Sequence, residues 1–190
     1  MSPPGRPKGE YRSAQQGGFL LSRLRERLIW DGEAGTLHDG PRRYLMLRPD
    51  VLMGAVQRLD GAAQAAMFDA LAAAVQQHGA DSLRAYAVAC GGDPEALIAA
   101  TVQAAADLGW GRWVLQRQGV ELHLHVHGSP FAQGWCDAGA ASPTQAVCAP
   151  IRGMLQALAT QVFAAPAIAT ECGCVVAGLA HCTFLAKARA

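Results

Sequence analysis

The segment that most restricts the fold is Glu121–His127, in which apolar and polar side chains alternate strictly. This period of two is typical of a β-strand with one buried face. A turn at Gln118 and Gly119 separates the segment from a second apolar run, so the two runs are expected to pair as a hairpin. The apolar positions of the strand are Leu122, Leu124 and Val126.

Helical periodicity and turn signals organise the rest of the chain. Strands are predicted over 43–47, 113–116, 121–127, 167–172 and 182–187, with a loop over 31–41. Helices are predicted over 19–30, 49–59, 61–79, 94–108 and 142–166, the third ending at His78 and Gly79. A run of helices followed by hairpins and a helix predicts an α+β fold, an antiparallel β-sheet packed with helices in one domain over 19–190.

Composition narrows the class of protein. The chain has 190 residues, of which 51% are hydrophobic and 16% charged, enough apolar material for one sizeable core. A net charge of +1 gives no footprint for direct nucleic-acid binding, and no apolar run of about 18 residues predicts a membrane span. Residues 1–18 are rich in Pro and Gly and lack the apolar core of a signal peptide, so a flexible tail and a cytoplasmic location are expected.

The sharpest chemical pattern lies in the last third of the chain. Three cysteines and one glutamate, Cys148, Glu171, Cys174 and Cys182, follow one another at offsets of 23, 3 and 8 residues. Three thiolates and a carboxylate fit a closed, four-coordinate zinc site. Cys148 is expected in the first turns of the helix that opens at Ser142, and the other three residues on one hairpin, so a metal would join the two elements. Buried cysteines without a metal are the alternative.

Residues from Pro143 to Lys187 resemble the 4-vinyl reductase domain. The signature of that family is a Cys, a Gly on the following helix, a Glu-x-x-Cys, a Gly and a final Cys before a hydrophobic strand. Here it is represented by Cys148, Gly153, Glu171, Cys174, Gly178, Cys182 and Phe184. Upstream residues that resemble the family are Gly128, Ser129, Phe131 and Ala132, so the match covers roughly 120–188.

The resemblance implies a fold, a metal and a function. The fold would be that of ligand-sensing and vesicle-tethering (TRAPP-like) relatives, usually dimeric, with an apolar cavity between helices and sheet. Zinc would be bound by Cys148, Glu171, Cys174 and Cys182. The function would be a non-catalytic sensor or carrier that binds a small hydrophobic or aromatic molecule. The apolar face of the helix over 19–30 also favours a homodimer.

Two other functions stay open at this stage. One is an accessory protein or enzyme of tetrapyrrole metabolism, in the vinyl reduction of bacteriochlorophyll synthesis. No motif for a nicotinamide or flavin is present in the sequence, so an enzyme is the less favoured of these. The other is a purely structural dimer or tethering module.

Three histidines, His123, His125 and His127, project from one face of the predicted strand, about 7 Å apart. A solvent-exposed or polar-packed face is favoured over a second metal site, which would need a third ligand from elsewhere. A third possibility is the polar lining of a pocket, in which a histidine binds a ligand oxygen or a tetrapyrrole metal. Since the resemblance places the cavity wall near the end of this strand, we predict that His125, His127, Phe131 and Trp135 bind the ligand.

Overall fold

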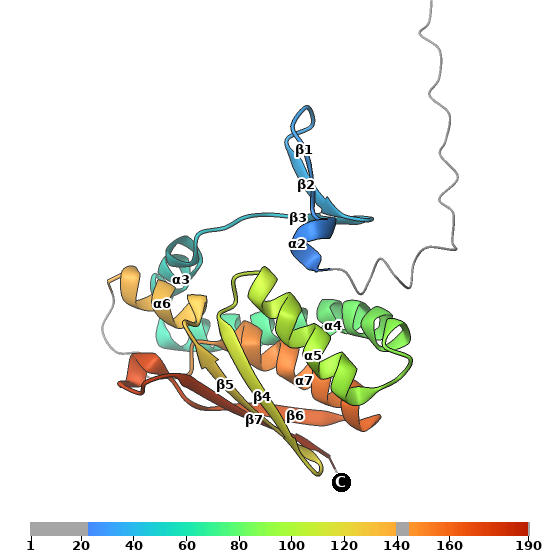
Figure 1. The fold of residues 1–190 in the computed structure, drawn as a ribbon. Helices are drawn as coiled ribbons and strands as arrows, with labels where there is room; N and C mark the ends of the chain where they lie inside the picture. The colour runs from blue at the N-terminus through green and yellow to red at the C-terminus, as the bar shows by residue number, and fades with distance from the viewer. Residues whose placement is uncertain (1–22, 140–144, 190) are drawn as a thin grey trace, which may run out of the picture.

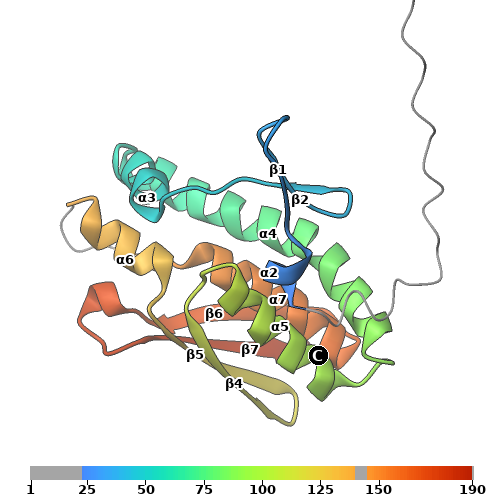
Figure 2. The same ribbon diagram turned by 45° about the horizontal axis from the view of Figure 1, so that its top comes forward.

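The computed structural model describes residues 23–139 and 145–189. The tail expected over 1–18 and the first residues of the helix expected over 19–30 lie outside this part of the chain. Within it, the order of elements is α+β, as expected. The main body is a four-stranded antiparallel sheet with helices on one face, and a small three-stranded sheet stands away from it (Figure 1, Figure 2).

The main sheet has the strand order β4-β5-β7-β6. Its strands are β4 (Arg112–Gln118), β5 (Glu121–His127), β6 (Ala167–Gly173) and β7 (Cys182–Ala188). Both predicted hairpins are present: β4 pairs with β5 and β6 with β7, while β5 and β7 join the hairpins at the centre of the sheet. The alternation of β5 has the expected effect, because Leu122, Leu124 and Val126 are fully buried and the three histidines lie on the other face.

The helices are α2 (Leu24–Arg27), α3 (Pro49–Gln57), α4 (Gly61–Ala89), α5 (Pro94–Asp107), α6 (Pro130–Asp137) and α7 (Ala149–Phe163), with a 3₁₀ turn η2 (Val175–Ala177). Helix α7 lies on the sheet, and α4 packs on α7. The Asp93 side chain caps α5 by accepting a hydrogen bond from the Glu95 backbone N–H at 3.0 Å, as the sequence predicts.

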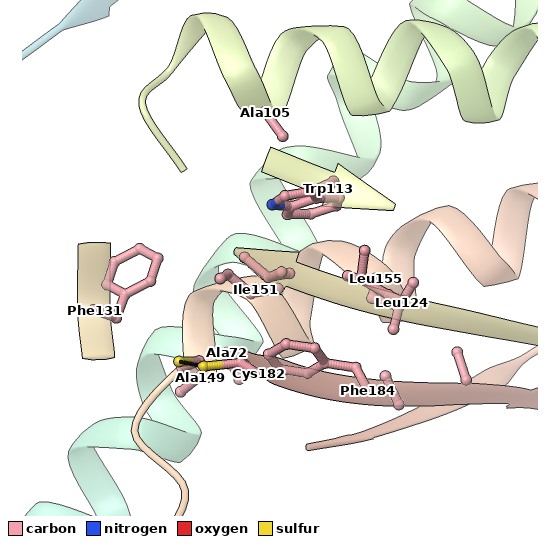
Figure 3. Close-up of a cluster of buried hydrophobic side chains, with 14 of the residues drawn as sticks. Ala72, Ala105, Trp113, Leu124, Phe131, Ala149, Ile151, Leu155, Cys182 and Phe184 are labelled. Carbon is pink, nitrogen blue, oxygen red and sulfur yellow. Dashed lines mark hydrogen bonds between the residues drawn. The ribbon is translucent and has the colours of Figure 1, made fainter. Parts of the chain in front are cut away.

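The core fills the space between α7, α5 and the sheet (Figure 3). Ile151 and Leu155 of α7 are fully buried, and they face Leu124 of β5, Phe184 of β7 and Trp113 of β4 in the same cluster (Figure 3). This packing explains the strict alternation of β5, whose buried positions are its apolar ones. No helix in the described residues is both long enough and apolar enough to cross a membrane.

The N-terminal segment differs most from the prediction. The helix expected over 19–30 is described only as α2, and its last residues form β1 (Ile29–Asp31). The expected loop contains β2 (Thr36–Asp39), and the strand expected at 43–47 is β3 (Arg42–Tyr44). Strands β1, β2 and β3 form the small sheet, which we call the arm. The helix ends because Ile29–Asp31 pairs with β2 in a hairpin, and helical periodicity does not show this pairing.

Two helix boundaries and one whole helix also differ from the prediction. Helix α4 continues ten residues past Gly79, because that glycine packs beside Met154 of α7 rather than ending the helix. Helix α6 was not predicted, although its Ser129 N-cap and Pro130 at the first position are ordinary start signals. Helix α7 begins at Ala149, with Cys148 at its N-cap position, so Cys148 precedes the helix instead of lying in its first turns.

Candidate metal centre and ligand cavity

The four residues of the Cys/Glu pattern meet at one end of the main sheet. Cys148 stands at the N-cap position of α7, and Glu171 lies near the end of β6. Cys174 directly precedes η2, and Cys182 is the first residue of β7. The β6–β7 connection therefore folds back to place two cysteines beside the start of α7. All three cysteines are buried.

The distances between the ligand atoms fit a single small ion. The Sγ atoms of Cys174 and Cys182 are 3.3 Å apart, and those of Cys148 lie 3.8 Å from Cys174 and 3.7 Å from Cys182. One carboxylate oxygen of Glu171 joins them within 4.8 Å. A tetrahedral zinc with Zn–S bonds of about 2.3 Å separates its sulfurs by roughly 3.8 Å. The donor set and its spacing therefore match a zinc site of the structural type.

The carboxylate of Glu171 is oriented but only half satisfied. Its Oε2 accepts a hydrogen bond from the Cys148 backbone N–H at 3.0 Å. Its buried Oε1 has no hydrogen-bond partner within the described residues. Burial, followed by the nearby Cys174, raises the pKa of Glu171 to about 8. A buried acceptor without a partner is costly, and a cation at the centre of the cluster would satisfy it.

The thiols share one hydrogen-bonded environment. Hydrogen bonds from Cys148 and Cys174 lower the pKa of Cys182 to about 4. The pKa of Cys148 is raised, first by its hydrogen bonds to the other two thiols and then by burial. One thiolate is thus favoured without a metal, whereas three would repel one another. Full ionisation of the cluster needs a bound cation, which is the behaviour of a zinc ligand set.

Ser129 is a member of the site that sequence reasoning missed. Its Oγ lies 3.2 Å from Cys148 Sγ, and it also accepts a hydrogen bond from the Ala132 backbone N–H at 3.4 Å as the N-cap of α6. The Ser-Pro pair at 129–130 marks a helix start in the sequence, but nothing there indicates contact with a cysteine. Such outer partners orient metal ligands. Ser129 therefore joins α6 to the candidate metal centre.

A cavity of about 680 Å³ lies between α4, α5 and the arm. Leu83, Leu108, Trp110 and Met154 supply apolar wall, and polar groups include the side chains of Thr101 and Tyr86. A further side of the cavity is formed by Leu24 of α2 and by the whole of β3, which belongs to the arm. The volume lies within the range of 300–1,000 Å³ common for small-molecule sites.

The arm is anchored beside this cavity by a buried ion pair. Arg27 donates from Nε and Nη2 to the two carboxylate oxygens of Asp39, each at 3.1 Å, and both residues are buried. Nη2 of Arg27 also donates to the Tyr86 hydroxyl of α4 at 3.1 Å. A second ion pair, between Arg23 at the start of α2 and Asp107 at the end of α5, has a length of 2.6 Å and joins these two helices. These contacts therefore hold α2 and the arm against α4 and α5, the helices that line the cavity.

The four predicted ligand-binding residues fall into two groups that do not meet. Phe131 and Trp135 are buried on α6, where Phe131 packs edge-on against Trp110 with ring centroids 5.5 Å apart. His125 and His127 lie on the sheet face away from the helices, beside His181. None of the four lines the cavity of 680 Å³. Phe131 contacts Trp110, which does line the cavity. The ligand-binding role of the four residues stays a prediction.

Solved structures show what this chain is similar to. The phenol-responsive sensory domain of the transcription activator PoxR, with phenol, matches with a TM-score of 0.75 at 14% sequence identity, covering 94% of this chain and 92% of that domain. This likeness confirms the fold expected from the resemblance to the 4-vinyl reductase domain.

Two further structures match more distantly. A trafficking protein particle complex subunit 3 from Naegleria fowleri, covalently bound to palmitic acid, has a TM-score of 0.49 at 11% identity, covering 75% of this chain and 95% of its own. A vinyl-4-reductase family protein from Methanocaldococcus jannaschii has a TM-score of 0.46 at 13% identity, covering 77% and 98%. No protein-family model and no curated protein matches the sequence at a significant level.

Proposed function

We propose that this chain is a non-catalytic sensor or carrier domain that binds a small hydrophobic or aromatic molecule and contains one structural zinc ion. The observation that carries the proposal is the cavity of about 680 Å³ between α4, α5 and the arm. The fold of a phenol-responsive sensory domain supports it. The cluster of three cysteines and a glutamate supports the zinc.

The lining of the cavity suits an apolar ligand with one polar end. Leu83, Leu108 and Trp110 offer apolar contact. The Tyr86 hydroxyl accepts a hydrogen bond from Arg27, which leaves its own proton to be donated to a ligand oxygen. An aromatic alcohol or a small carboxylic acid has this combination of an apolar body and an oxygen at one end.

Zinc would act at a distance from the ligand. With three thiolates and a carboxylate as ligands, zinc has no open position for water or substrate, so it supplies stability rather than chemistry. Cys148 would hold the start of α7 against the β6–β7 connection, and Met154 of the same helix reaches the cavity. The metal would therefore fix one wall of the binding site.

The arm offers a route from ligand to partner. Leu24 and β3 line the cavity, so a molecule bound there would contact the arm directly through β3. The arm and the segment after it expose large apolar side chains, including Trp30 at 60%, Leu45 at 83% and Met46 at 73%. Exposed apolar patches of this kind mark interaction sites, and we propose that a second copy of the chain covers them in a homodimer.

A cavity-filling variant tests the binding proposal. Ala104 of α5 lines the cavity, whereas Ala106 of the same helix is exposed and does not. We expect Ala104→Trp to abolish binding while zinc and the folded state are kept, and Ala106→Trp to bind normally. The probes are phenol, benzoate and octanoate, titrated by calorimetry, with native mass spectrometry of the fresh protein to detect a co-purified molecule. The proposal is wrong if no probe binds and nothing co-purifies, or if Ala104→Trp binds as well as the unmodified chain.

A further inference from the structure

The face of the main sheet that carries no described helix holds a second cluster of metal-ligating side chains. His125 and His127 lie on this face of β5. The chain returns to the same place at His181, the residue before β7 begins. The register explains the meeting, because Val126 is paired with Cys182, so the residue before that cysteine stands beside the histidines on either side of Val126.

The three imidazoles lie side by side, and His181 is in contact with both of the others. Nδ1 of His125 lies 2.9 Å from Nε2 of His181. The ring centroid of His181 is 4.9 Å from that of His125 and also 4.9 Å from that of His127. Two nitrogens bound to one metal at about 2.05 Å are separated by roughly 2.9 Å in square or octahedral geometry and 3.3 Å in tetrahedral geometry. The nitrogens of His125 and His181, which share a hydrogen bond here, are at such a separation. An ion bound there would replace this hydrogen bond, and the ring of His127, which lies beside that of His181, would turn toward the ion.

We propose that His125, His127 and His181 form a second metal site, which binds a divalent transition-metal ion of the kind that prefers imidazole ligands, such as Ni²⁺, Cu²⁺ or Zn²⁺. The site is separate from the Cys/Glu centre and faces the other side of the sheet. It also supplies the third ligand that a His-x-His pair lacks in the sequence. Three protein ligands leave coordination positions open, so this ion would be exchangeable and accessible from outside.

The neighbouring charged groups define which residues belong to the site. His123, on the same face of β5, already pairs with Glu121 at 2.9 Å, and Glu121 pairs with Lys187 at 2.7 Å. It therefore stands outside the cluster. Arg112 is the cross-strand partner of His127. Burial and then this guanidinium lower the pKa of His127, which keeps its imidazole neutral as metal binding requires. The same positive charge opposes a cation, so its removal should favour binding.

The test is a nickel titration of the full chain, without a histidine tag and with its cysteine centre loaded with zinc. Calorimetry gives stoichiometry and affinity, and metal analysis after the titration confirms that zinc stays bound. Near-ultraviolet absorption shows whether any nickel has reached thiolates. We expect one Ni²⁺ per chain with no thiolate charge-transfer band. His125→Gln and His181→Gln should each weaken binding at least about tenfold, because loss of even an outer hydrogen-bond partner costs a metal site that much.

Two further variants make the assignment specific. His123→Gln is the matched control on the same strand and face, and it should bind Ni²⁺ as the unmodified chain does. Arg112→Gln should bind more tightly. The proposal is overturned if the zinc-loaded chain takes up no Ni²⁺, if the bound Ni²⁺ shows thiolate bands, or if His125→Gln and His181→Gln bind like the control.

Discussion

A methyl group added at Gly153 is expected to push two helices apart. Gly153 lies in α7 where this helix crosses α4, and a Cβ atom built there would stand 2.2 Å from the carbonyl oxygen of Ala72 and 2.9 Å from its carbonyl carbon. These atoms belong to the backbone of α4 and cannot rotate away. The crossing is the tightest approach of a glycine to another element among the described residues, which explains why a glycine stands at this position of the signature.

Two opposing effects set the size of the change in Gly153→Ala. Replacing Gly by Ala inside a helix stabilises by about 0.5–1 kcal/mol. Overpacking a core costs about 1–3 kcal/mol or more, and a backbone contact of this kind falls at the upper end. The net loss is about 2 kcal/mol, and each 1 kcal/mol lowers the Tm of a domain of this size by roughly 2–4 °C.

Gly79→Ala is the matched control on the partner helix. Its added Cβ would meet the terminal methyl of Met154 at 2.9 Å, and this flexible end can move. The helix propensity gain should then prevail, so Tm stays the same or rises slightly. Calorimetric melting of the zinc-loaded forms measures both variants. If Gly153→Ala melts at or above the unmodified chain, the close crossing of α4 and α7 is wrong.

Three further predictions concern the metal centre and the arm. Cys174→Ser should lose zinc and melt at lower temperature, whereas Cys172→Ser, an exposed cysteine two residues away, should keep zinc; equal zinc content in both would count against the site. The pKa of Glu171 is raised from 4.5 to about 8 in the folded chain, so between these pH values the folded state holds a proton that the unfolded state releases, and stability falls as pH rises. Glutamine does not titrate, so the Tm of metal-free Glu171→Gln should rise relative to that of the unmodified chain from pH 5 to pH 8. Once zinc is added, the Tm of the variant should fall below that of the unmodified chain. A Tm difference independent of pH would contradict this. Sedimentation should show a dimer at micromolar concentration, which Trp30→Ser together with Leu45→Ser should weaken; a monomer of the unmodified chain would refute the dimer.

The sequence predicted those parts of the fold whose signals are local. The alternation of apolar residues in Glu121–His127 defined β5 and its buried face, and the Asp93 cap defined the start of α5. The four candidate zinc ligands were named from their spacing together with the resemblance to the 4-vinyl reductase domain, and the fold brings them together within 4.8 Å.

The features that the sequence did not show depend on contacts between distant segments. Helix α4 passes through Gly79 because α7 covers it. The cavity is lined from α2, β3, α4 and α5 together, so no single motif marks it. His181 meets the histidines of β5 only through the pairing of β5 with β7. Such placements follow from register and packing, which a single sequence does not specify.

The most direct test of the account is the metal content of the full chain, purified under reducing conditions and passed over a weak chelator to remove loosely held ions. Native mass spectrometry and elemental analysis should find one zinc per folded chain, held by Cys148, Glu171, Cys174 and Cys182, and removal of that zinc by a strong chelator should lower Tm. A folded chain with well under one equivalent of zinc, unchanged in Tm after strong chelation, would contradict the zinc centre.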